Sequence, residues 1–433
     1  MGATNGLSFS EDYFSQHEGE TVQRVHFADA GEKERLVAWA GYFELDVWRV
    51  SAGPVGSMDV RMGAGWEHLL KLLPDGLSAE VLVDDIEARM RDQLFPHHHQ
   101  EEDEAEENEE NKEGMERTDP GFFLSYHTYE EIVSFLEDQQ QEYPQFVRVF
   151  EFGTTADGNA IMAVNIRAPG DQPLQEIVFN GGIHAREWIA PATMTYLIHY
   201  LTEALADGGN PLASQYSWTI VPVLNVDGYL WTWSNSRMWR KNRRQVSPKC
   251  IGVDNNRNFP FHWGITAGGE SSSDPCSDAY HGPSAASELE TQALIGYWEE
   301  HHENILAYFD IHAYGELWLT PWGYTFARPP LDDFWLQNNS SSAAVHAIYQ
   351  VHRQSYTNGE GAATIYPTSG DTTDTSYGVY GIVYSQTIEL RGPSRSAYGF
   401  LLPANQIIPQ GQEFVAGVNA AVTFMSRNAP SKK

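Results

Sequence analysis

NGGIHAREW, at residues 180–188, is the stretch from which both the fold and the chemistry of this chain can be inferred. An apolar segment precedes it at residues 177–179, and an amphipathic segment follows it at residues 189–205. This order predicts a buried strand, a tight turn at two glycines and a helix. The turn carries His184 and Glu187 three residues apart, so an imidazole and a carboxylate lie together at the strand end. Such a pair supplies two of the three protein ligands of a catalytic zinc site, whose fourth position holds water.

Context distinguishes this pair from other copies of the His-x-x-Glu pattern. The pattern also occurs at His99 and Glu102, in an acidic low-complexity segment, and at His127, at a predicted helix start. Those two copies are interpreted as chance matches. On the pattern alone, chance remains an alternative for the pair in NGGIHAREW too. A metal site there would need a second histidine and a separate carboxylate for proton transfer.

Candidates for these missing groups end two other apolar strands. His312 directly follows ILAYFDI, and Glu389 lies near the end of IVYSQTIEL. In open α/β sheets, side chains at the carboxyl ends of strands lie over the ligand crevice. A buried acid is costly unless it has a partner or a task. Taken singly, each residue has a structural alternative, a hydrogen-bonded core histidine and a paired buried acid, but their parallel positions favour a shared site.

A third candidate group is cationic, in an otherwise acidic protein. RMWRKNRR occupies residues 237–244, and DNNRN follows at residues 254–258. A guanidinium can bind a carboxylate through two parallel hydrogen bonds, so these residues can form an anion site. The alternative is a solvated loop that offsets nearby acids.

Composition restricts the class of protein. The 433 residues carry a formal net charge of −32, which argues against nucleic-acid partners and against anionic membranes, because both require basic patches. No apolar run approaches the ~20 residues of a transmembrane helix. The opening, MGATNGLSFSEDYF, lacks the pattern of a signal peptide. The two cysteines, Cys250 and Cys276, can close one surface loop as a disulfide or remain as two free buried thiols.

Periodicity and charge divide the chain into three parts. Residues 1–96 contain alternating strand and helix patterns and are predicted to form a small α/β domain. Residues 97–117 are predicted to be a disordered acidic linker, open to cleavage at Lys112 or Arg117. Its first residues, HHH, are interpreted as part of this polar tract, with metal binding as the alternative. Residues 118–433 predict an α/β fold, a mixed, mostly parallel twisted sheet with helices on both faces.

The expected elements follow from the same patterns. In the first part, strands are expected at 22–27, 43–50, 57–62 and 79–82, and helices at 32–39, 64–73 and 84–94. In the third part, strands are expected at 147–154, 160–167, 177–179, 218–223, 305–311 and 382–390. Its helices are expected at 129–142, 189–205, 287–300, 340–358 and 412–425.

The chain resembles a zinc metallocarboxypeptidase precursor of the pancreatic carboxypeptidase A/B type, which consists of a propeptide and a catalytic domain. The resemblance covers nearly all of residues 126–425. It rests on separated stretches in the same order, HAREW, NVDGY, RMWRKNR, GVDNNRN, PCSDAYHG, FDIHAYG, TIYPTSG, IELRG and YGFLLPANQIIP. One such match is weak, but the series is specific. LDVWRV and MDVRM in the first part resemble the family's propeptide more loosely.

Matching motifs imply roles for individual residues. The implied ligands of one Zn²⁺ per chain are His184, Glu187 and His312. The implied catalytic residues are Glu389, as general base, and Arg240, which stabilises the oxyanion with the zinc. The residues implied to hold the substrate's terminal carboxylate are Asn256, Arg257 and Tyr366. Arg186 and Tyr314 are implied to line subsites further from the terminus. The resemblance also favours the disulfide between Cys250 and Cys276.

Two departures from the family pattern affect specificity and one loop. Thr373, the position that faces the substrate's final side chain, is neither the apolar residue of the A type nor the acid of the B type. The expectation leans to apolar or aromatic final residues, although Asp371 and Asp374 flank the position and leave a basic preference open. The segment LRGPSRSAYGF after Glu389 is one residue longer than is usual in the family.

The expected function is zinc-dependent hydrolysis of the C-terminal peptide bond, with release of single amino acids, by an enzyme made as a zymogen. The expected partners are peptide or protein C-termini and an activating endoprotease that cuts the 97–117 linker; no nucleic acid and no membrane are expected, and the protein is expected to be a monomer. One alternative is an inactive pseudo-peptidase that binds peptides or wall components. The resemblance implies an extracellular location, which suits the sequons at Asn338 and Asn339. The missing signal peptide leaves a vacuolar or cytosolic enzyme open.

Overall fold

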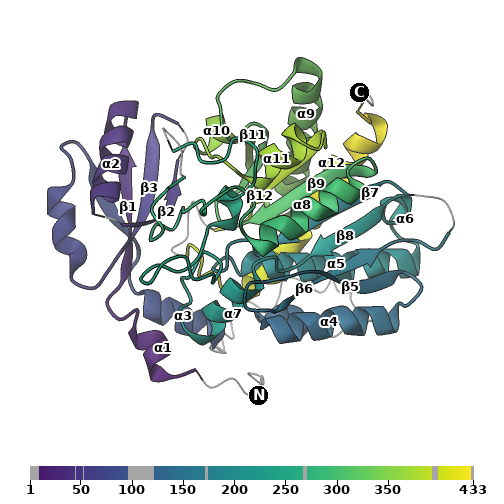
Figure 1. Cartoon of the computed structure of the whole chain (residues 1–433), viewed down its shortest axis with the longest axis horizontal. Coiled ribbons are helices and arrows are strands. Elements are labelled where there is room, and N and C mark those ends of the chain that lie inside the picture. Colours follow the sequence, from purple (N-terminus) through teal and green to yellow (C-terminus); the bar gives the residue numbers. More distant parts are fainter. Residues whose placement is uncertain are drawn as a thin grey trace.

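The computed structural model describes residues 9–43, 45–51, 53–95, 121–170, 174–266, 271–392 and 398–430. These residues form two β-sheets with their helices (Figure 1). The predicted linker, with its histidines and its cleavage sites, lies outside the described residues, as do residues 393–397 of the longer loop after Glu389. None of the helices in the described ranges combines the length and the hydropathy that crossing a bilayer requires.

The smaller sheet, formed by the first part of the chain, is antiparallel with the strand order β2-β3-β1-β4. Its strands are β1 (Thr21–Phe27), β2 (Asp46–Val50), β3 (Gly56–Met62) and β4 (Ser78–Val83). Its helices are α1 (Glu11–Ser15), α2 (Ala30–Tyr42), the 3₁₀ helix η1 (Trp66–Leu72) and α3 (Ile86–Leu94). The carboxylates of Asp29 and Asp85 cap α2 and α3 by accepting backbone N–H bonds. The helix expected at 64–73 is a 3₁₀ helix, α1 was not predicted, and the other elements overlap the expected ranges.

The two faces of this small sheet pack against different cores. Val25, Phe27 and other side chains of one face pack on α2 and form a core within the first part of the chain. On the other side, Trp48 and Val83, together with α1 and α3, join the main core of the rest of the protein. The first part of the chain is thus joined to the larger sheet's domain through a shared apolar core.

The larger sheet has eight strands in the order β11-β10-β12-β9-β7-β8-β6-β5. Their bounds are β5 (Val147–Thr154), β6 (Ala160–Ile166), β7 (Glu176–Gly181), β8 (Ser217–Val221), β9 (Ile305–His312), β10 (Leu317–Thr320), β11 (Thr357–Glu360) and β12 (Tyr384–Glu389). The pairs β7–β8, β7–β9, β9–β12 and β10–β11 are parallel, and the other three pairs are antiparallel. This confirms the predicted mixed, mostly parallel sheet.

Helices flank both faces of this sheet, as predicted (Figure 1). The main ones are α4 (Tyr129–Glu142), α5 (Ile189–Asp207), α7 (Val226–Ser234), α8 (Leu289–His301), α9 (Leu331–His352), α11 (Thr372–Gly378) and α12 (Ile407–Arg427). The helix expected at 340–358 corresponds to α9, which begins nine residues earlier, at Leu331, and ends six residues earlier, at His352; Arg353 follows with a positive φ of 61°. Strands β10 and β11 were not predicted, because four residues are too few for alternation to be recognised.

Three neighbouring parallel strands bring the candidate residues to one edge of the sheet. Strand β9 lies between β7 and β12, and His312 is in register with Glu389. Gly181, at the end of β7, is in register with Ile311 on β9. Parallel strands place their carboxyl ends at the same edge, so the turn after β7 and the last residues of β9 and β12 meet there.

The turn after β7 depends on its glycines. Gly182 has a φ of 61°, in the left-handed region, and a Cβ atom there would lie 3.2 Å from both Cα of Val223 and Cγ of Pro191. A residue with a side chain is therefore disfavoured both by conformation and by space. The glycine lets the chain pass closely between the end of β8 and the start of α5.

Replacing Gly182 by alanine should lower the free energy of unfolding by roughly 1–3 kcal/mol, because strain and crowding add. Denaturant unfolding of the variant measures this loss. The control is Gly208→Ala, which has a similar φ of 67° but no atom within 4 Å of the added Cβ. Equal losses in the two variants would contradict the role given to crowding.

Candidate metal centre and substrate cleft

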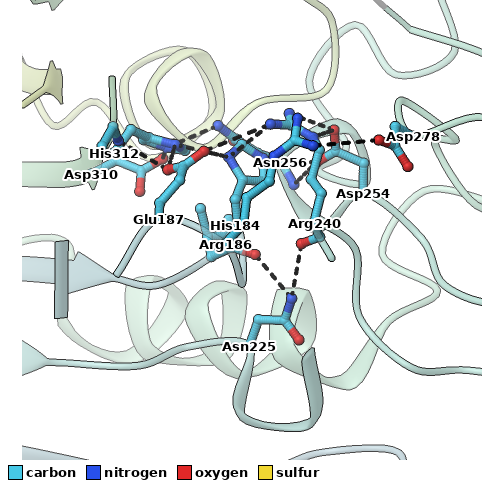
Figure 2. A network of polar contacts seen from close by, with 12 residues as sticks. His184, Arg186, Glu187, Asn225, Arg240, Asp254, Asn256, Asp278, Asp310 and His312 are labelled. Carbon is cyan, nitrogen blue, oxygen red and sulfur yellow. Dashed lines mark hydrogen bonds and ion pairs between the residues drawn. The ribbon is translucent and has the colours of Figure 1, made fainter. Parts of the chain in front are cut away.

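Three buried side chains converge at the edge of the sheet. His184 and Glu187 come from the turn after β7, and His312 ends β9 (Figure 2). Nδ1 of His184 lies 2.8 Å from Oε1 of Glu187 and 3.1 Å from Nδ1 of His312, and Nδ1 of His312 lies 3.3 Å from Oε2 of Glu187. Two ligand atoms on one tetrahedral zinc are about 3.3 Å apart. The group therefore fits a zinc ion.

Each of the two histidines has a carboxylate behind it. Nε2 of His184 lies 3.1 Å from Oδ1 of Asp254, and Nε2 of His312 lies 2.8 Å from Oδ2 of Asp310. A carboxylate on the outer ring nitrogen fixes the orientation of a metal-binding imidazole and leaves its other nitrogen for the metal. Asp254 and Asp310 were not predicted, although they stand in the quoted stretches GVDNNRN and FDIHAYG.

The charges of the group suit a cation. Burial alone would raise the pKa of Glu187, but the adjacent imidazoles of His184 and His312 outweigh burial and lower it. Burial likewise acts to raise the pKa of Asp254, and Arg240 and His184 outweigh it, so this pKa lies well below its usual range. Both carboxylates are therefore ionised at neutral pH, which is the form that binds a metal or accepts a hydrogen bond from a ligand histidine.

Arg240 lies directly beside the three converging side chains. Its guanidinium bonds Oδ2 of Asp254 at 2.8 and 3.2 Å, and Nη1 lies 3.7 Å from Oε1 of Glu187. Its backbone carbonyl accepts hydrogen bonds from the N–H of Ala185 at 3.0 Å and from the amide of Asn225 at 3.4 Å. The loop with the basic stretch is thus tied to the turn of NGGIHAREW, and one cation is held next to the metal group (Figure 2).

A cleft opens over this group. Ten of the residues singled out in the sequence line it; they are His184, Glu187, Arg240, Asn256, Arg257, His312, Tyr314, Tyr366, Thr373 and Glu389. Glu389 enters from the end of β12, and burial raises its pKa to about 7. A carboxylate with a pKa near neutrality can both accept and return a proton.

The amide and guanidinium groups expected to bind a carboxylate lie on a short 3₁₀ helix, η3 (Asn255–Arg257). The amide of Asn256 lies 3.2 Å from Nε2 of His312, and its oxygen accepts the N–H of Thr372 at 2.9 Å. Arg257 donates to the carbonyl of Asn256 at 2.8 Å. The groups expected to bind an anion are therefore held at a fixed distance from the metal group.

Arg186, the remaining predicted substrate residue, is covered by the first part of the chain. Its Nη1 lies 3.0 Å from Oδ1 of Asp46 on β2 and 3.7 Å from Oδ2 of Asp278. The hydroxyl of Tyr314 similarly donates to Oδ2 of Asp59 on β3, at 3.1 Å. Both predicted upstream residues therefore contact the small antiparallel sheet, and neither Asp46 nor Asp59 could be paired with them from the sequence.

The two cysteines are joined, as the resemblance favours. Cys250 and Cys276 form a disulfide with their Cα atoms 4.9 Å apart, so the alternative of two free thiols is wrong. The bridge lies near Lys241, whose ammonium donates to the carbonyls of Pro275 and Ser277 at 3.2 and 2.9 Å. The basic loop and the loop that carries Asp278 are thus linked both covalently and by hydrogen bonds.

Comparison with known proteins agrees with this geometry. The profile of a family described as zinc carboxypeptidase matches residues 132–417. The chain is 38% identical to carboxypeptidase B of Astacus astacus over 306 residues, which are 70% of this chain and 98% of that protein. It is 32% identical to human carboxypeptidase A1 over 416 residues, which are 94% and 93% of the two chains. The crystal structure of carboxypeptidase A from Helicoverpa armigera covers 95% of this chain and 98% of its own, with a TM-score of 0.80 and 27% identity. The chain belongs to the zinc carboxypeptidase family.

Proposed function

We propose that this metallocarboxypeptidase binds zinc through His184, Glu187 and His312 and removes single residues from the C-termini of peptides after its first domain has been displaced. The observation that carries the proposal is one cleft that holds a three-ligand metal group, a carboxylate with a raised pKa and the groups of Asn256 and Arg257. When a free carboxylate is bound at an anion site, a metal at a fixed distance from that site lies next to the last peptide bond. That arrangement suits an exopeptidase.

Each residue of the cleft has a separate role in the proposed reaction. Bound zinc supplies Lewis-acid polarisation of the scissile carbonyl and acidifies water. Glu389 accepts the proton of the attacking water and delivers it to the departing amine. Arg240 donates hydrogen bonds to the carbonyl oxygen as it gains negative charge. Asn256, Arg257 and Tyr366 hold the terminal carboxylate, so that only the last peptide bond lies near Glu389.

The test uses the full chain, cut by an endoprotease between the two sheets and supplied with one equivalent of zinc. Blocked dipeptides with a free C-terminus should lose their final residue, and the same dipeptides with an amidated C-terminus should not, because they lack the charge that Arg257 binds. The panel should include apolar, aromatic, basic and acidic final residues, since the apolar preference expected from Thr373 is the finer part of the proposal. Failure on every free-acid substrate, or equal cleavage of the amides, would contradict the proposed function.

The proposal includes a zymogen form. Trp48 and Arg49, both from β2, line the cleft, and the neighbouring Asp46 forms an ion pair with Arg186. Asp59, which Arg24 binds at 2.6 and 2.7 Å, accepts the hydroxyl of Tyr314. The first domain thereby covers the side of the cleft where the upstream part of a peptide would lie. Cleavage in the 97–117 linker is the proposed route to its removal.

Replacing Asp46 by asparagine should raise the activity of the uncut chain roughly tenfold or more. Burial acts to raise the pKa of Asp46, but Arg186 and Arg61 outweigh it and lower the pKa, so the carboxylate is charged where it meets Arg186. Loss of one partner of a buried interfacial charge pair typically weakens the free energy of binding across the interface by about 2–5 kcal/mol. Hydrolysis by the uncut chain, in the presence of endoprotease inhibitors, measures the effect.

Asp84→Asn is the matched control for this prediction. Asp84 belongs to the same domain, but its side chain is 74% exposed and its ion-pair partner is Arg89 of the same domain. This variant should keep the low activity of the uncut parent. If Asp46→Asn and Asp84→Asn behaved alike, the contact with Arg186 would not contribute to inhibition.

The proposed setting is extracellular and the proposed form is a monomer. A disulfide between Cys250 and Cys276 persists most readily in an oxidising compartment. The proposed partners are the C-termini of peptides or proteins and one activating endoprotease.

A further inference from the structure

The carboxylate proposed as the general base takes its position from its main chain. Within the described residues, the side chain of Glu389 forms no hydrogen bond and no ion pair. Glu389 is the last residue of β12, in register with His312 on β9 and with Leu317 on β10. A side chain that no donor holds is placed by its backbone and by packing. Contacts that fix the chain at and just beyond Glu389 therefore fix the base relative to the metal group.

On one side, this segment is tied to the turn between β9 and β10. The N–H of Leu390 donates to the carbonyl of His312 at 2.8 Å. The carbonyl of Leu390 accepts the N–H groups of Gly315 and Glu316, both at 3.1 Å. A Cβ atom on Gly315 would lie 3.0 Å from Cβ of Glu389, so the packing is close as well. The segment is thus attached to the chain that carries a proposed zinc ligand.

On the other side, Arg391 is held by α12 and by the residue before that helix. Its Nε donates to Oε2 of Glu413 at 2.8 Å, and its Nη2 donates to Oε1 of the same carboxylate. Its Nη1 donates to Oε1 of Gln406 at 2.7 Å, and its backbone N–H donates to Oε1 of Gln410 at 2.9 Å. Both the main chain and the side chain are therefore fixed two residues beyond Glu389.

The ion pair between Arg391 and Glu413 is buried, and its anchor is firm. The side chain of Glu413 is 0% exposed and that of Arg391 is 13% exposed. Phe414 and Val418, on the same helix, belong to the main core. A buried ion pair adds little net stability, because the cost of desolvation offsets its attraction. Two parallel hydrogen bonds from a guanidinium nevertheless impose one geometry, so the pair contributes mainly to the position of the chain.

We infer that Glu413, acting through Arg391, is a positioning residue for the general base Glu389. The ion pair prevents the chain beyond β12 from shifting relative to β9 and so holds the base next to the metal group. The same segment packs on an upstream substrate residue, since a Cβ atom on Gly392 would lie 2.0 Å from Cβ of Tyr314. The inference rests on the proposed function and adds to it an ion pair that does not belong to the lining of the cleft.

The first test is Glu413→Gln in the cut, zinc-loaded enzyme. We expect kcat to fall by about 10–100-fold while KM for a free-acid dipeptide and the zinc content stay unchanged, because a small displacement of a reacting group slows the chemical step without weakening binding. His352→Gln is the matched control. Nδ1 of His352, on α9, lies 3.1 Å from Oε1 of Glu413, so this variant also removes a contact of that carboxylate, from a side chain that is 36% exposed. It should keep nearly full kcat.

A double variant separates positioning from stability. Arg391→Met combined with Glu413→Leu removes both charges and leaves apolar side chains of similar volume, so Tm should stay close to that of the parent. We expect kcat of this folded variant to remain low, because the anchor is gone. A purely structural role would instead restore kcat together with Tm.

Hydrogen exchange measures the anchor without catalysis. In Glu413→Gln, the amides of Leu390 and Arg391 should exchange at least about tenfold faster than in the parent, while those of β7 should keep their protection. Full kcat in the folded double variant, or unchanged exchange in Glu413→Gln, would overturn the inference and leave the exopeptidase intact. Loss of zinc in parallel with kcat would also overturn it. An inactive parent enzyme would contradict the proposed function, and the inference with it.

Discussion

Replacing Glu389 by glutamine should lower kcat of the cut, zinc-loaded enzyme by about 10²–10⁴-fold with little change in KM. The amide keeps the shape of the carboxylate but cannot accept the proton of the attacking water. Asn256, Arg257 and Tyr366 remain in place, so binding of the terminal carboxylate is retained. Initial rates on one blocked dipeptide over a range of concentrations separate kcat from KM.

Glu176→Gln provides the control for this experiment. Glu176 is a buried glutamate at the start of β7, where it accepts the hydroxyl of Tyr297 at 2.6 Å, far from the carboxyl edge of the sheet. Its variant should keep nearly full kcat once folded. The pseudo-peptidase, a binding module without turnover, predicts a different result. In that case the parent chain would be as inactive as Glu389→Gln, and both would bind peptide equally well.

Removal of zinc should abolish the activity of the cut chain and lower its Tm, and one equivalent of Zn²⁺ should restore both. A ligand that binds only the folded state stabilises it in proportion to the logarithm of its concentration relative to Kd. His312→Ala should lose activity and also lose the zinc-dependent shift in Tm, since one of three ligand side chains is gone. Thermal unfolding with chelator and then with added zinc measures the second effect independently of catalysis.

His127→Ala is the control for the metal prediction. His127 belongs to another His-x-x-Glu pattern, but its ring stacks on Phe122 with centroids 3.8 Å apart and lies beside the helix-capping residue Thr128. This variant should bind one zinc per chain, as the parent does. If the His312→Ala variant bound as much zinc as the parent, the proposed ligand set would be wrong.

Local patterns predicted much of the fold and the grouping of the metal ligands with Glu389, whereas most other residues of the cleft were named through the resemblance to the family. Apolar strands that end in His312 and Glu389, and the glycine turn before His184, placed these groups at one edge, because parallel strands share a direction. Short or irregular elements were harder to predict. The four-residue strands β10 and β11 are too short for a periodic signal, and the pattern that predicted a helix at 64–73 does not distinguish the 3₁₀ form of η1 from an α-helix.

Contacts between distant parts of the chain could not be predicted from spacing. Asp254, which contacts His184, lies 70 residues after it in the sequence. Asp46, which contacts Arg186, lies 140 residues before it. Neither acid stands out in its own stretch, since each pairing depends on how the separate units pack.

The shared apolar core of the two domains has a consequence for how activity would appear with time. A cut in the linker removes one covalent connection and leaves Trp48, Val83 and the side chains of α1 and α3 still packed in the main core. An interface of that kind resembles those of permanent complexes, which separate slowly. Activity would then lag behind proteolysis, and warming of the nicked protein, without any further cleavage, would shorten the delay.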